Sequence, residues 1–154
     1  MIEKACEGIE YYLTHDIKET MNEFNVKTKK KGVDEAKLRL FPNWADIEFV
    51  TPGVDGNVLK AEWGFSASDK VVLYAGNIGK KQGLESILDV AEKMQSNRWV
   101  HFVLVGAGAQ LDILRADAAE RGLIHVHFKP LQPWERVPEM LALADVHLVI
   151  QKKG

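Results

Sequence analysis

Residues 71–83 read VVLYAGNIGKKQG, and this stretch decides the fold of the chain. The apolar run Val71–Ala75 is typical of a buried strand, and apolar residues at helical spacing begin directly after Gly83. A strand, a glycine turn and a helix N-terminus in this order suit an anion, because glycine lets the backbone approach a ligand and the first helical N–H groups lack partners. Lys80 and Lys81 add positive charge. The alternative is an ordinary turn with two solvated lysines.

The same alternation of strand and helix continues to the C-terminus. Further buried strands are predicted at Val100–Val105, Ile124–Phe128 and Val146–Ile150. Between them, apolar residues at helical spacing indicate amphipathic helices; these are Leu84, Ile87, Leu88, Ala91 and Met94, then Leu111, Leu114 and Ala118, then Val137, Met140, Leu141 and Ala144. This order predicts an α/β fold, a Rossmann-like parallel sheet with flanking helices on both faces.

The first half of the chain is less regular. We expect a strand at Ile9–Leu13, a helix from Thr14 to about residue 24 and a short strand at Leu38–Phe41. From residue 47 to 69 the pattern is weak, with one helical turn around Val58–Trp63. The sequence therefore divides into a distinct segment over 1–46, a connector over 47–69 and an α/β unit over 70–154.

Composition and charge exclude several classes of protein. The 154 residues are 46% hydrophobic and carry a net charge of −2, which gives no reason to expect a nucleic-acid partner. The single Cys6 excludes an internal disulfide. No run approaches the roughly 20 apolar residues of a membrane span, and the N-terminus lacks a signal-peptide pattern. We therefore expect a cytoplasmic chain.

A second glycine turn follows the strand predicted at Val100–Val105. Gly106 and Gly108 precede a helix there, but Gln110 and Leu111 stand where the dinucleotide fingerprint needs its third glycine, so a nicotinamide cofactor is not expected. Two glycine turns at the ends of parallel strands meet at the carboxyl edge of the sheet, where α/β folds bind ligands.

Two histidines, His125 and His127, alternate with a valine in a predicted strand. This spacing would place both imidazoles on one face, as a possible metal pair. No third histidine or cysteine lies at useful spacing, and zinc sites need three or four ligands. We therefore predict no metal site.

Several stretches together resemble one known family. Residues 38–46, LRLFPNWAD, resemble the "PNGVD" segment of GT-B fold bacterial glycosyltransferases, and residues 71–83 resemble the first strand and donor-phosphate loop of their C-terminal domain. Residues 102–108 match the family's "VGxG" turn, and residues 126–146 match the block that follows it. Residues 76–85, GNIGKKQGLE, resemble the corresponding stretch of the family 4-like enzymes of colanic-acid and capsular polysaccharide biosynthesis.

The resemblance implies a retaining transferase with two Rossmann-like domains that needs no metal or cofactor. A nucleotide-sugar donor, with a UDP-sugar favoured, would bind the C-terminal domain, and a glycan or lipid-linked acceptor would bind the N-terminal domain. Residues matching the diphosphate loop are Gly76, Asn77, Gly79, Lys80 and Lys81; Gly106 and Gly108 match a second donor loop, and Lys129, Pro130 and Leu131 match the turn that contacts the base.

The chain also departs from the family. Many relatives have arginine where Asn77 stands, and Gln82 separates Lys81 from the glycine that the family lysine usually precedes. The sequence ends before the family block whose two glutamates bind the donor, so no catalytic residue is assigned. We expect a fragment, inactive alone, in which residues 1–46 are the closing segment of the N-terminal domain and the crossover.

Two further expectations follow. A sheet edge left open beside the last strand would favour a homo-oligomer, with residues 9–46 exchanged between chains as one arrangement. The parent protein could lie peripherally at the inner face of the membrane.

The alternative function is a stand-alone Rossmann-like module that binds a phosphorylated ligand without catalysis.

Overall fold

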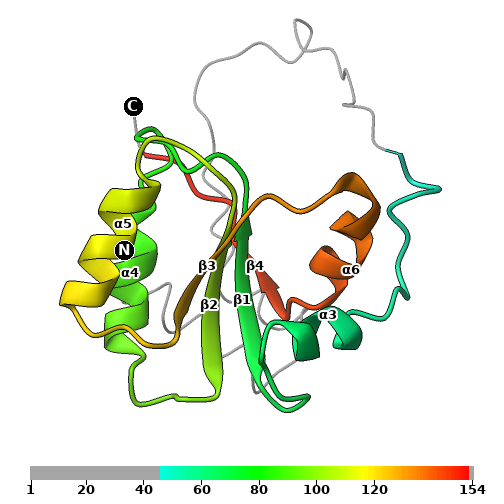
Figure 1. The fold of residues 1–154 in the computed structure, drawn as a ribbon, viewed down its shortest axis with the longest axis horizontal. Coiled ribbons are helices and arrows are strands. Elements are labelled where there is room, and N and C mark those ends of the chain that lie inside the picture. The colour runs from blue at the N-terminus through cyan, green and yellow to red at the C-terminus, as the bar shows by residue number, and fades with distance from the viewer. Residues whose placement is uncertain (1–45, 153–154) are drawn as a thin grey trace, which may run out of the picture.

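The computed structural model describes residues 46–152 (Figure 1). The elements expected at Ile9–Leu13, after Thr14 and at Leu38–Phe41 lie outside these residues. Among residues 46–152, none of the helices has the length and apolar composition of a membrane span.

Four parallel strands form one sheet in the order β3-β2-β1-β4. They are β1 (Lys70–Ala75), β2 (Val100–Val105), β3 (Val126–Lys129) and β4 (Val146–His147). The register pairs Lys70 with Val100 and continues in step to the carboxyl ends of β1 and β2. The pairs β2–β3 and β1–β4 are also parallel, which confirms the predicted class of sheet.

The two outer strands are shorter than the sequence predicts. β3 starts two residues late because Ile124 and His125 belong to a turn, in which the Val126 N–H donates to the carbonyl of Leu123 at 3.1 Å. Ile124 is accordingly 82% exposed. β4 ends three residues early, although the Leu148 N–H still donates to the Leu73 carbonyl at 2.8 Å and the chain runs on beside β1.

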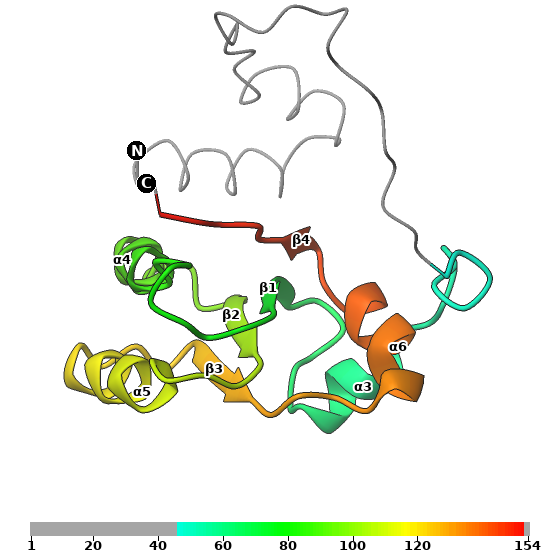
Figure 2. The ribbon, with the colours of Figure 1, turned by 90° about the horizontal axis from the view of Figure 1, so that it is seen from above.

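Helices cover both faces of the sheet (Figures 1 and 2). The amphipathic helices α4 (Glu85–Lys93) and α5 (Leu111–Glu120) lie on one face, and α3 (Asn57–Glu62) and α6 (Val137–Ala142), preceded by the 3-10 turn η2 (Trp134–Arg136), lie on the other. Each face buries its own apolar core, one centred on Phe102 and Leu88 and the other on Leu59 and Leu73. Burial on both faces explains why β1 and β2 are mostly apolar, with Lys70 and His101 near their starts.

Asp145 ties the start of β1 to the start of β4. Its carboxylate accepts from the Val71 N–H at 2.9 Å and from the Lys70 ammonium at 2.8 Å. The ammonium of the buried Lys60 lies 4.0 Å from the same carboxylate and donates to the Asp69 carbonyl at 2.6 Å. Asp145, part of the block that resembles the family, therefore positions strands and lies apart from the glycine loops.

Candidate anion site at the carboxyl edge of the sheet

The two glycine loops leave neighbouring strands and bind each other. The Gly76 N–H donates to the Val105 carbonyl and the Ile78 N–H to the Ala107 carbonyl, both at 2.9 Å, while the Gln110 N–H donates to the Ile78 carbonyl at 3.1 Å. Ile78 is fully buried and anchors the first loop in the core. The structure thus brings the two predicted loops together at one edge.

Gly106 and Gly108 are required by this contact itself. A Cβ atom at Gly106 would overlap the carbonyl oxygen of Gly76, and one at Gly108 would overlap the carbonyl oxygen of Ile78. Both glycines also have positive φ values, 155° and 156°. These two glycines are therefore needed for the backbone-to-backbone packing of the loops, whether or not a ligand binds there.

The first loop presents its cations to solvent. Lys80 and Lys81 are exposed, and within residues 46–152 their ammonium groups form no ion pair. The Tyr74 hydroxyl fixes the loop from below by donating to the Asn77 carbonyl at 2.9 Å, and burial raises the pKa of this hydroxyl. A Cβ at Gly79 would lie 2.5 Å from Asn77 Nδ2 and 2.8 Å from Gln82 Oε1, so this glycine lets two amide side chains converge.

Helix α4 begins at the end of this loop without a side-chain cap. Its N-cap residue Leu84 offers no hydrogen-bonding side chain, and the N–H groups of Ser86 and Ile87 donate to the carbonyls of Gly83 and Leu84 at 3.2 and 2.9 Å. The positive end of the helix dipole still favours negative charge at this point. Gly83 has φ +68°, a left-handed conformation that suits glycine. Glu85 stands in the first turn, where its carboxylate lies 3.4 Å from the Lys152 ammonium.

The sequence reasoning gave no role to two residues that lie near the site. Gln82 Oε1 is buried and has no hydrogen-bond partner in the described part of the chain. The unusual place of Gln82 between a lysine and a glycine was the signal that could have identified it. Lys152 lies beside the loop through tertiary pairing, because its N–H donates to the Lys81 carbonyl at 3.0 Å, and no local pattern indicates this.

The turn after β3 is mostly engaged by the protein itself. The Lys129 carbonyl accepts from the Gly106 N–H at 3.2 Å, and the Lys129 ammonium lies 5.4 Å from the centroid of the Trp63 ring. The Pro130 carbonyl accepts from the Gln132 amide at 2.8 Å. Leu131 is exposed and keeps a backbone N–H and carbonyl for which the described residues show no partner.

The predicted arrangement of the two histidines on one strand face is wrong. His125 belongs to the turn before β3, and its Nε2 lies 3.0 Å from the carbonyl of Ala91 in α4. His127 points to the other face, where its Nε2 lies 3.1 Å from His101 Nδ1. The described residues contain no group of three or more side chains able to hold a metal.

The His101–His127 pair is packed under Phe65. The Phe65 ring stacks on His101 at 4.7 Å and contacts His127 edge-on at 4.9 Å, and His101 Nε2 lies 3.4 Å from an Asp69 carboxylate oxygen. Burial, with the nearby charges of His101 and Lys129, lowers the pKa of His127 to about 4. Its imidazole is therefore neutral at physiological pH.

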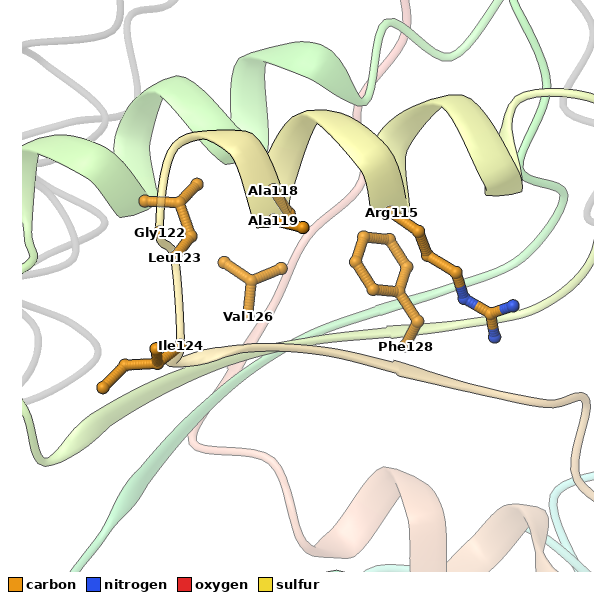
Figure 3. Close-up of a pocket in the computed structure, with 8 residues that line it drawn as sticks. All are labelled: Arg115, Ala118, Ala119, Gly122, Leu123, Ile124, Val126 and Phe128. Atoms are coloured by element: carbon orange, nitrogen blue, oxygen red, sulfur yellow. The ribbon is translucent and has the colours of Figure 1, made fainter.

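A separate cavity of about 270 Å³ lies between α5 and β3 (Figure 3). Its lining is mainly apolar, with Arg115 at the rim and 5.9 Å from the Phe128 ring centroid. It lies on the flank of the sheet and includes no residue of either glycine loop.

The arrangement of the sheet and loops defines a class. Parallel strands, with glycine loops meeting at the carboxyl edge, place the chain among the Rossmann-like α/β proteins, which bind ligands beyond the ends of their strands. Within that class, the chain belongs to the family described as glycosyl transferases group 1, whose model matches residues 56–152.

Individual relatives agree with this assignment. WcaI of Escherichia coli K12, named as a glycosyl transferase of colanic acid biosynthesis, is 36% identical over 130 residues, which cover 83% of this chain and 32% of WcaI. The chain thus spans about a third of the length of this relative.

Solved structures share the fold. Anabaena HepE, solved in complex with UDP and glucose, has a TM-score of 0.56 at 22% identity, covering 68% of this chain and 29% of HepE. The C-terminal domain of LpcC, a glycosyl transferase group 1 family protein of Francisella tularensis, has the same TM-score at 14% identity, covering 68% of this chain and 57% of that domain.

Proposed function

We propose that this chain forms the first half of the donor domain of a bacterial glycosyltransferase. The parent enzyme would transfer a sugar from a nucleoside-diphosphate donor to a glycan or lipid-linked acceptor in polysaccharide biosynthesis. The observation that carries the proposal is the exposed pair Lys80 and Lys81, which forms no ion pair among residues 46–152 and directly precedes helix α4 in the chain. The domain boundaries proposed from the sequence, 1–46, 47–69 and 70–154, go with this function.

The diphosphate is assigned to the loop from Gly76 to Lys81. Glycine backbone, two ammonium groups and the positive end of α4 all favour negative charge there. In the parent enzyme the same groups would stabilise the nucleoside diphosphate as it leaves, without a metal ion. Asn77 would contribute a neutral hydrogen bond where many relatives have a positive guanidinium.

The nucleoside is assigned to the other two loops. The second glycine loop supports the first from beneath, and the turn Lys129–Leu131 adjoins it through the bond from Gly106 N–H to the Lys129 carbonyl. Within this turn, Leu131 has a backbone N–H and carbonyl that find no partner among the described residues and could bind a base edge. The solved complexes of HepE with UDP and with UDP-glucose support a UDP-sugar as the donor.

The 154-residue chain alone is not expected to transfer sugar, because it spans 32% of the length of WcaI and the acceptor would bind elsewhere in the parent protein. We assign the parent enzyme to the cytoplasm, peripheral at the inner face of the membrane, where a lipid-linked acceptor is available.

Titration with UDP tests the proposed function. We expect UDP to shift the amide resonances of residues 79–84 in a nitrogen-15-labelled sample of the chain. A charge-assisted contact to phosphate contributes about 1.5–3 kcal/mol, so Lys81→Ala should weaken UDP binding about ten- to a hundredfold. Lys93→Ala, at the far end of α4, is the matched control. Unchanged affinity in Lys81→Ala would show that the loop is only a turn.

A further inference from the structure

The chain segment after β4 crosses the first glycine loop, residues 76–83, which carries Lys80 and Lys81 and is called the lysine loop below. The Leu148 N–H donates to the Leu73 carbonyl at 2.8 Å, and Ile150 packs against the core beside α4. Two residues later, the Lys152 N–H donates to the Lys81 carbonyl at 3.0 Å. The position of Lys152 relative to the loop is therefore fixed by backbone hydrogen bonds on both sides of Ile150.

The side chain of Lys152 runs over the beginning of α4. A Cβ at Gly83 would lie 2.7 Å from Lys152 Cγ and 3.2 Å from its Cε, so the aliphatic stem rests on the glycine. The ammonium group reaches Glu85 in the first helical turn, 3.4 Å from Oε1. Lys152 thus brings a positive charge to the N-terminus of the helix that follows Lys80 and Lys81 in the chain.

We infer, as an extension that rests on the proposed function, that Lys152 is a third phosphate-binding lysine of the donor site and that a donor phosphate displaces Glu85 from it. The carboxylate of Glu85 occupies a position favoured for negative charge, between an ammonium group and the positive end of α4.

The Lys152–Glu85 pair has the properties of an exchangeable contact. Both side chains are about half exposed, and an exposed ion pair of this kind is weak. A diphosphate brings more charge and more acceptor oxygens than a carboxylate, so it competes well for the same ammonium group. Lys152 also supplies a positive charge to a loop in which Asn77 lacks the charge of an arginine.

UDP titrations of variants of the 154-residue chain test the role of Lys152. We expect Lys152→Ala to weaken UDP binding about three- to tenfold, and Lys152→Arg to restore most of the affinity. Lys93→Ala should leave the affinity unchanged. Glu85→Gln should tighten binding about two- to fivefold, and this gain should fall below about twofold when Lys152 is also alanine, because no lysine is then released.

The outcomes separate the two claims. If UDP shifts residues 79–84 and Lys81→Ala weakens binding, but Lys152→Ala does not, the role of Lys152 is overturned and the proposed function stands. If Glu85→Gln gives its full gain without Lys152, displacement of Glu85 from Lys152 is overturned. If the wild-type chain shows no shift with UDP, the proposed function fails for this chain, and the role of Lys152 with it.

Discussion

The lysine loop and the His101–His127 pair use polar side chains in opposite ways. On the α3 and α6 face, His101 and His127 are packed under Phe65 and bonded to each other, and the buried Lys60 donates to a carbonyl beside Asp145. At the carboxyl edge, the ammonium groups of Lys80 and Lys81 form no ion pair in the described part of the chain. Buried polar groups are paired for stability, whereas unpaired cations beside a helix N-terminus are available to a ligand.

The largest effect is expected where the two glycine loops touch. Gly106→Ala places a Cβ onto the Gly76 carbonyl, so the loops must separate, with a loss on the order of 3 kcal/mol in the free energy of unfolding. Urea denaturation measures this loss.

Gly64→Ala is the control for Gly106→Ala. Gly64 has φ +89° and nothing within 4 Å of an added Cβ, so only the backbone strain of about 1 kcal/mol is expected. Equal losses in the two variants would contradict the steric role of Gly106.

The low pKa of His127 predicts that the folded chain loses stability in mild acid. The pKa of His127 is about 4 in the folded chain and 6.5 in the reference state, so the unfolded chain binds more protons between these values. The contribution of His127 to the free energy of unfolding is fully present above about pH 6.5. It is lost as the pH falls toward 4, and the loss is at most about 3 kcal/mol. Burial also lowers the pKa of His125, which acts in the same direction. Urea midpoints measured between pH 7 and pH 4.5 detect the change.

His127→Gln separates this effect from general acid denaturation. The variant should be less stable at pH 7 but should lose less stability on acidification, because it has no imidazole to protonate. A wild-type midpoint that does not move above pH 4.5 would contradict the assigned burial of His127.

The smallest effect concerns the edge of the sheet beyond β4. In the part of the chain that the structure describes, β4 pairs only with β1, and Val149 beside it is 97% exposed. Such an edge favours weak self-association, which light scattering at increasing concentration should detect. Val149→Lys should weaken it, whereas Val58→Lys on α3 should not. A monomeric mass at all concentrations would contradict the expected oligomer; exchange of residues 9–46 lies outside the described residues.

The sheet could be predicted where local pattern and tertiary burial agree. Val100–Val105 is apolar except for His101 and is mostly buried, so the predicted bounds of β2 match the structure. Ile124 and Val149 are equally β-prone, but a turn exposes the first and the end of pairing exposes the second. The local sequence pattern does not distinguish an apolar residue inside a strand from an apolar residue just outside the end of that strand.

The candidate site could be predicted only in outline. The order of strand, glycine and helix identified both loops, yet the packing of Gly106 against Gly76 depends on the β1–β2 register. Likewise, Lys152 comes to Lys81 because β4 pairs with β1, across a long sequence separation. Residue roles that depend on such pairing were not available from the sequence alone.

The interlocked glycine loops also constrain how this region can diverge. Loops at the ends of strands usually accept insertions and new side chains, because their backbone lies in solvent. Here a residue larger than glycine at 106 or 108 requires a different backbone path at 76 or 78, on the other loop. A substitution in one loop therefore requires a change in the other, whereas at Gly53 or Gly122 an added Cβ meets nothing within 4 Å and only the strain of a positive φ opposes it.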